Sequence, residues 1–334
     1  MIGHRWARDL LDRAAHRGRL GHAYLFAGPP SVGKTALAMH LAAILVCTGP
    51  QPRPCGVCRA CRQLARNSHP DVRLIERAAE RRDITIEQVR GIEEEIALAP
   101  FEAAHKLFCL VGADALNDSA ASALLKTLEE PPAHATLVLC AADPLALPIT
   151  VRSRCQQLTL QPVAADTIVE ALVAQHNVDP ARAHELAVLA RGRPGWAVQA
   201  LEKPDLVDQA RVAMSGIAGL ARMGPFSRLM VIDEWLGKGT SFVESRERAL
   251  SFLALLEGWW RDALLVSQER AAPQLHHYLL GDVDRLTCPP SEIVAFLVRV
   301  QEAAARVEAN GVPRLVLEQL IGGMPTSRES VRHG

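Results

Sequence analysis

Residues 28–35, which read GPPSVGKT, decide the fold of this 334-residue chain. They match the pattern G-x-x-x-x-G-K-[S/T] at every position. A short apolar run at 24–27 precedes the motif, and residues 34–41 follow it with the composition of a helix. In a strand–loop–helix context, the glycines let backbone N–H groups close around a phosphate at the positive end of the helix. The stretch therefore predicts a phosphate-binding loop.

Four residues of this loop are the candidate nucleotide ligands. Gly28 and Gly33 supply the backbone freedom that lets the loop approach a phosphate. Lys34 would reach the β- and γ-phosphates, and Thr35 would ligate Mg²⁺. A glycine-rich turn without a ligand is the alternative. The motif indicates descent from a nucleotide-binding protein, but such a loop can persist after nucleotide binding has been lost.

Hydrolysis needs a second, acidic site at the end of a neighbouring strand, where Mg²⁺ is held and water is polarised. The strand expected at 107–111 ends in Val111-Gly112, with no Asp-Glu pair. Asp114 comes later and falls in the turn. The sequence thus predicts a loop able to bind ATP or ADP with Mg²⁺ without hydrolysing it.

The first half of the chain alternates between strand-like and helix-like patterns. The expected strands are 24–27, 72–75, 107–111, 137–140 and 157–160. Their nearly continuous apolar character predicts a parallel sheet covered on both faces. Residues 1–162 are therefore expected to form a five-stranded α/β nucleotide-binding domain.

After Pro162 the expected strands stop. Residues 163–204 are interpreted as a small domain of three short helices, and 205–334 as an all-helical domain. Apolar side chains recur at helical spacing in this last part, which is typical of a helix-bundle core. Two such stripes are Leu253, Leu256, Trp260 and Leu264, and Ile293, Phe296, Leu297, Val300, Ala304 and Val307.

Half of the eight cysteines gather within one short segment, 47–61. They are Cys47, Cys55, Cys58 and Cys61. The two-residue spacings let successive thiolates converge on one tetrahedral ion, and the longer loop can bring in the fourth. Four protein ligands close such a site, which predicts a structural Zn²⁺ module inserted in the first domain. An iron–sulfur cluster is the alternative, because four cysteines also hold those.

The overall composition excludes several classes of protein. Lys and Arg number 37 and Asp and Glu also 37, so the formal charge is zero, and aromatic residues make up only 4%. A protein that coats nucleic acid through bulk positive charge is therefore excluded, although a local basic patch is not. No apolar run approaches the roughly 20 residues that span a bilayer, and the N-terminus is charged too early for a signal peptide. We expect a cytoplasmic protein without membrane contact.

Two further strings complete a family resemblance. Residues 122–132 read SALLKTLEEPP, and 153–155 read SRC just before the last expected strand. With the phosphate loop, the cysteines, IEQVR at 86–90 and NGVPRLVLEQL at 310–320, they resemble the delta-prime subunits of bacterial DNA polymerase III clamp loaders. These belong to the AAA+ superfamily. The resemblance covers nearly the whole chain.

Gamma and tau, the motor subunits of that family, share these strings. The positions that distinguish the two types are those at which motor subunits carry the residues for ATP hydrolysis. Motor subunits carry an Asp-Glu pair where this chain has Val111-Gly112, and hydroxyl residues where it has Ala141-Ala142. They place an arginine where this chain has Gly195, and Arg193 is expected to face elsewhere. These departures favour the delta-prime type.

The resemblance implies a mechanism and partners. Arg154 of the SRC string would be an arginine finger acting in trans on the ATP site of a neighbouring motor subunit. Implied partners are the gamma/tau and delta subunits, with the sliding clamp and primed DNA reached through the assembled complex. The C-terminal domain would join the collar of the loader. Two alternatives are an active gamma/tau-type ATPase and a zinc-dependent nucleic-acid-binding module that uses the loop domain as a scaffold.

Overall fold

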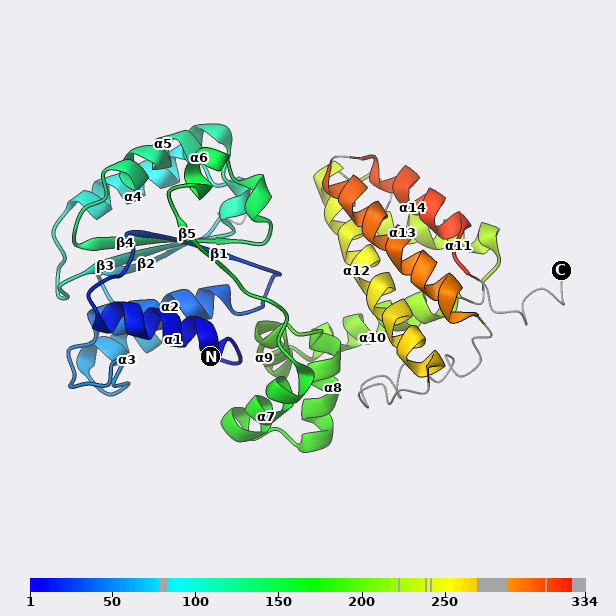
Figure 1. Ribbon diagram of the computed structural model, residues 1–334, viewed down its shortest axis with the longest axis horizontal. Coiled ribbons are helices and arrows are strands. Elements are labelled where there is room, and N and C mark those ends of the chain that lie inside the picture. The colour runs from blue at the N-terminus through cyan, green and yellow to red at the C-terminus, as the bar shows by residue number, and fades with distance from the viewer. Residues whose placement is uncertain are drawn as a thin grey trace. The chain divides into compact units, whose positions relative to one another are not determined.

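The computed structural model is described in two compact units, residues 1–202 and 203–334. It describes residues 1–77, 83–221, 223–237, 239–240, 242–268, 288–309 and 311–325. Asn310, which belongs to one string of the family resemblance, lies outside the described residues. Both units are drawn in Figure 1.

A five-stranded parallel sheet lies at the centre of the first unit, as the apolar runs predicted. Its strands are β1 (Ala23–Ala27), β2 (Val72–Ile75), β3 (Lys106–Val111), β4 (Ala135–Ala141) and β5 (Gln156–Thr159). Their order is β2-β3-β4-β1-β5, and every neighbouring pair is parallel. The central strand β4 is buried along its whole length, as expected of a strand covered on both faces.

Helices cover both faces of this sheet (Figure 1). On one side are α4 (Ile86–Ala97), α5 (Asp118–Glu129) and α6 (Ile149–Arg152), and on the other α1 (Arg5–His16), α2 (Lys34–Val46) and α3 (Arg59–Ala65). Successive strand side chains point to opposite faces. Leu25 and Leu139 therefore pack in the core with α4 and α5, whereas Phe26 and Cys140 pack in the core with α1 and α2.

Three further helices belong to the same unit. They are α7 (Ala165–His176), α8 (Pro180–Ala190) and α9 (Pro194–Glu202). The turn before α9 needs a glycine, because Gly192 has a φ of +76° and a Cβ there would lie 2.5 Å from Cβ of Pro162. The backbone N–H of Val163 donates to the Gly192 carbonyl oxygen at 2.9 Å. These contacts join the α8–α9 turn to the chain that leaves the sheet.

The second unit is helical. Its helices are α10 (Pro204–Leu220), α11 (Pro225–Leu236), α12 (Phe242–Ser267), α13 (Pro290–Glu308) and α14 (Pro313–Gly322). The rings of Trp260 on α12 and Phe296 on α13 meet edge to face, with centroids 5.2 Å apart. Most of the predicted apolar stripes are buried, namely Leu253, Leu256, Trp260, Ile293, Phe296, Val300 and Val307. Across the described residues of both units, every helix is too short or too polar to cross a membrane.

One buried arginine links the end of α10 to the chain that follows α14. Arg228 is only 1% exposed. Its guanidinium donates to the carbonyl oxygens of Leu220 at 2.9 Å, Met324 at 2.8 Å and Pro325 at 3.2 Å. The end of α10 and the chain after α14 thus share one buried cation.

We expect Arg228→Met to lower the free energy of unfolding by about 2–4 kcal/mol, because buried carbonyl oxygens lose their donor. Arg299→Met is the matched control. Arg299 also donates to this C-terminal turn, at 2.8 Å to the Gly323 carbonyl, but from a partly exposed position. Urea unfolding of the intact chain measures both. Equal losses from the two variants would contradict the prediction.

Candidate functional site

The phosphate loop leaves β1 and enters α2, where the motif predicted it. The backbone N–H of Gly28 donates to the carbonyl oxygen of Ala141 at 3.2 Å, so the loop is tied to the end of β4. A Cβ at Gly28 would lie 2.3 Å from the Leu160 carbonyl oxygen, which explains why glycine is required there. Gly33 precedes α2 with a φ of +120°, a conformation that L side chains rarely adopt. The conformation of the loop backbone thus requires glycine at both positions.

The start of α2 offers the donors that a phosphate needs. Within the described residues, no side chain caps this helix, so its first N–H groups remain available at its positive end. The ammonium of Lys34 donates to two loop carbonyl oxygens at 2.5 and 2.8 Å. Burial lowers the pKa of Lys34, while Cys140 and Asp114 act in the opposite direction. With Thr35 beside the lysine, the residues present fit the phosphates of a nucleotide.

The turn that follows β3 carries a single carboxylate. β3 ends at Val111, and Gly112 follows with a φ of +73° before the 3₁₀ turn η1 (Ala113–Ala115). Asp114 lies in that turn, and its carboxylate accepts the backbone N–H of Ala142 at 2.9 Å. Between Val111 and Asn117, Asp114 is the only acidic residue.

Helix α9 contacts the phosphate loop through backbone atoms. The N–H of Gly195 donates to the carbonyl oxygen of Ser31 at 2.8 Å. A Cβ at position 195 would lie only 2.8 Å from the same oxygen, so a side chain there would force the loop or the helix to move. Arg193 is engaged elsewhere, because its Nε donates to the Ala190 carbonyl at 2.9 Å and so closes the end of α8.

The four clustered cysteines converge in space. Their sulfur atoms all lie within 4.8 Å of one another. Cys47 follows α2, and Cys58 caps α3 by accepting the backbone N–H of Cys61. Sulfurs around a tetrahedral ion with bonds of about 2.3 Å would be about 3.8 Å apart. The Sγ atoms of Cys47 and Cys58 are 4.0 Å apart. The cluster could therefore hold a metal ion.

The pKa values of the clustered cysteines shift in opposite directions. A hydrogen bond from the backbone N–H of Cys61 lowers the pKa of Cys58 to about 5. A backbone hydrogen bond from Val57 likewise lowers the pKa of Cys55. Burial instead raises the pKa of Cys61 to about 12. A bound dication would favour the deprotonated form of all the cysteines.

A buried carboxylate beside this module was not predicted from the sequence. Asp71 is 1% exposed and accepts three successive backbone N–H bonds from 101–103, at 2.6, 2.8 and 2.8 Å. The same turn carries Glu102, which pairs at 3.0 Å with Arg59 on α3. The turn after α4 is thus held both by the chain entering β2 and by the cysteine segment. The partners are backbone groups far away in the chain, so no sequence motif marks the contact.

Arg154 lies between α6 and β5, on a turn anchored on both sides. Its Nη2 contacts Oε1 of Glu129 at 2.7 Å, and its Nη1 donates to the Thr150 carbonyl at 2.9 Å. Ser153 donates its hydroxyl to the same carbonyl at 3.1 Å. Cys155 packs against the core under α4 and α5, and burial raises its pKa to about 12. The SRC string therefore mounts Arg154 at the surface on a fixed support.

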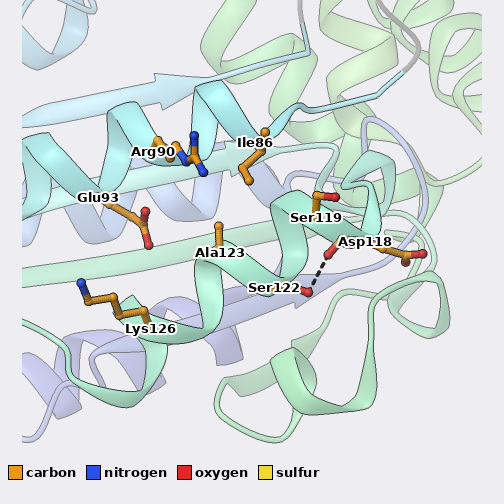
Figure 2. A pocket seen from close by; sticks show the side chains of 8 residues that line it. All are labelled: Ile86, Arg90, Glu93, Asp118, Ser119, Ser122, Ala123 and Lys126. Carbon is orange, nitrogen blue, oxygen red and sulfur yellow. Dashed lines mark hydrogen bonds between the residues drawn. The ribbon is translucent and has the colours of Figure 1, made fainter.

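An open groove of about 590 Å³ lies between α4 and α5 (Figure 2). It is lined by Ile86, Arg90, Glu93, Asp118, Ser119, Ser122, Ala123 and Lys126. Two of these side chains are basic and two are acidic. The Ser122 hydroxyl donates to the Asp118 carbonyl oxygen at 2.8 Å within α5. The groove thus presents no net positive charge to a polyanion.

The parallel sheet, the phosphate loop after β1 and the helices that follow β5 define a P-loop nucleotide-binding fold of the AAA+ type. A family model described as "DNA polymerase III, delta subunit" matches residues 3–164. The chain belongs to the family of bacterial DNA polymerase III clamp-loader subunits.

Both tau and delta-prime subunits are among its relatives. The chain is 32% identical to DNA polymerase III subunit tau of Salmonella typhimurium, over 96% of this chain and 50% of the relative. It is 35% identical to the delta' subunit of Pseudomonas aeruginosa, over 65% of this chain and 66% of the relative. It is 27% identical to the delta' subunit of Bacillus subtilis, over 93% of each. The chain thus spans about half the length of this Salmonella tau subunit.

We expect the purified chain to contain one equivalent of metal that Cys58→Ser removes, because the variant breaks the convergent thiolate set. Metal content by mass spectrometry measures this. Cys288→Ser is the control, since that buried thiol lies outside the cluster. Visible absorption with bound iron would identify an iron–sulfur cluster. Full metal retention by Cys58→Ser would contradict the prediction.

Proposed function

We propose that this chain is the delta-prime subunit of a bacterial DNA polymerase III clamp loader, which helps to load the sliding clamp on primed DNA. It acts as a non-hydrolysing stator and supplies Arg154 to the ATP site of a neighbouring motor subunit. The observation that carries the proposal is the combination of an anchored, surface-mounted Arg154 with a phosphate loop beside Val111-Gly112. A planar guanidinium matches γ-phosphate oxygens and stabilises their charge during transfer.

The proposed partners are the gamma/tau motor subunits and the delta subunit, with clamp and primed DNA contacted through the assembly. Residues 1–162, with the cysteine module 47–61, would carry the finger, 163–204 the small helical domain, and 205–334 the collar. The delta' and tau names of the relatives support this assignment. A role in replication places the chain in the cytoplasm.

Two cofactors belong to the proposal. Structural Zn²⁺ suits a closed set of four thiolates, and it would join the end of α2 to the start of α3 through Cys47 and Cys58. ATP or ADP would be held by the first turn of α2 and Lys34, with the Thr35 hydroxyl on Mg²⁺. Because the acid pair is missing, bound nucleotide would act as a structural ligand.

The alternatives are weaker on specific observations. An active gamma/tau-type ATPase would need acids where Val111-Gly112 stands and a side chain where Gly195 touches Ser31. A zinc-dependent nucleic-acid-binding module would need a basic surface. The chain has a formal charge of zero, and the groove between α4 and α5 is charge-balanced.

We expect Arg154→Ala in a reconstituted loader to reduce ATP turnover at the facing motor site by about 10³-fold, because the developing phosphate charge loses its counterion. Phosphate release measures turnover, and size-exclusion chromatography measures assembly, which should persist. Arg73→Ala is the matched control, because Arg73 forms a comparable surface ion pair with Glu95 at 2.9 Å. Unchanged turnover in an intact Arg154→Ala loader would refute the trans finger.

We also expect the isolated chain to bind labelled ATP without releasing phosphate. Lys34→Ala should weaken binding by about 10- to 100-fold, since one charge-assisted contact is lost. Lys126→Ala, which changes a surface lysine in the α4–α5 groove, should leave binding unchanged. Hydrolysis at motor-like rates, abolished by Lys34→Ala, would overturn the stator assignment and favour the gamma/tau alternative.

A further inference from the structure

We propose that Glu129, the last residue of α5, is a positioning residue for Arg154. Its carboxylate and the Thr150 carbonyl hold the guanidinium so that its other N–H groups are presented to a phosphate of the neighbouring subunit. This inference rests on the proposed function of Arg154 as a trans arginine finger. It adds a partner within this chain that orients the finger before the neighbour is engaged.

The contact geometry restrains the whole guanidinium plane. Glu129 Oε1 lies 2.7 Å from Nη2, and the Thr150 carbonyl accepts from Nη1 at 2.9 Å. A guanidinium has five N–H donors. These two contacts engage both terminal nitrogens. Among the residues that the structure describes, no other acceptor contacts the Arg154 guanidinium, so N–H donors remain for phosphate oxygens.

The supports on both sides are themselves fixed. Glu129 follows Leu128, which is 3% exposed in the core beneath α5. Thr150 lies in α6, which packs against α5, and Cys155 reaches into the same core. The ion pair therefore links the end of α5 to the turn that carries the finger. A long arginine side chain held this way loses less conformational freedom when it meets its target.

The exposure of the pair separates positioning from folding stability. The side chains of Arg154 and Glu129 are 36% and 52% exposed, so solvent screens their attraction and the pair adds little to stability. Glu130 is a matched neighbour. It is also acidic and exposed, and within the described residues it forms no ion pair with Arg154. A comparison of the two glutamates thus isolates the contact from local charge.

The test uses the reconstituted loader with Glu129→Gln, Glu130→Gln, Arg154→Ala and the double variant Glu129→Gln/Arg154→Ala. We expect Glu129→Gln to lower kcat for ATP by about 10- to 100-fold, as misplacement of a catalytic group does, with KM and assembly unchanged. Glu130→Gln should stay within about twofold of wild type, as a surface change away from the site. The double variant should match Arg154→Ala, because Glu129 acts through the arginine.

The outcomes separate this inference from the proposed function. If Arg154→Ala lowers turnover and Glu129→Gln does not, the finger stands and the positioning role is refuted. If Arg154→Ala has no effect, both fail. An equal loss on adding Glu129→Gln in the wild-type and Arg154→Ala backgrounds would show that Glu129 acts independently. Loss of assembly or of thermal stability by Glu129→Gln alone would assign a structural role and also overturn the proposal.

Discussion

The parallel pairing of β1 with β4 and of β4 with β3 is the constraint on which the candidate nucleotide site depends. Parallel strands bring their carboxyl ends to one edge of the sheet, so the loops that follow them are neighbours. The hydrogen bond from Gly28 to the Ala141 carbonyl is a direct consequence. This geometry comes from burial of apolar strands on both faces and does not require catalysis. The sheet can therefore position the phosphate loop whichever residues follow β3, which here are Gly112 and the turn that carries Asp114.

The contact between α9 and the phosphate loop likewise follows from backbone geometry and packing. A backbone hydrogen bond joins Gly195 to Ser31, and the space at position 195 is too small for a side chain without rearrangement. A backbone N–H carries no net charge with which to follow the loss of a γ-phosphate. The contact that joins α9 to the phosphate loop therefore contains no charged group that could respond to the loss of a γ-phosphate. Such an attachment suits a subunit that offers a fixed surface to its neighbours.

Patterns among residues close together in the sequence predicted the strands and the cysteine cluster. Apolar runs located the five strands. The two-residue spacings predicted that the cysteine sulfurs converge, and in the structure they lie within 4.8 Å of one another. The contacts that hold the sites were out of reach of such patterns. Glu129 meets Arg154 from another helix, and Arg228 donates to carbonyls 96 and 97 positions away. Backbone carbonyls have no residue signature, and an Arg–Glu pair becomes visible only when tertiary structure places two elements together. Likewise, the helical pattern of 194–202 predicts α9 but not its contact with the phosphate loop.

The proposed arginine finger also explains how a chain with no net charge could recognise a phosphate. A carboxylate already bound to Arg154 competes with any anion that approaches, so a single phosphate ion in solution has little to gain by displacing it. A nucleotide held in a neighbouring subunit presents several charges at fixed positions, and it can use the remaining N–H donors while Glu129 stays in place. The arginine is then selective by geometry instead of by excess positive charge. On this arrangement the finger becomes effective only within a correctly assembled interface, which is the property that a subunit acting on its neighbour's ATP site requires.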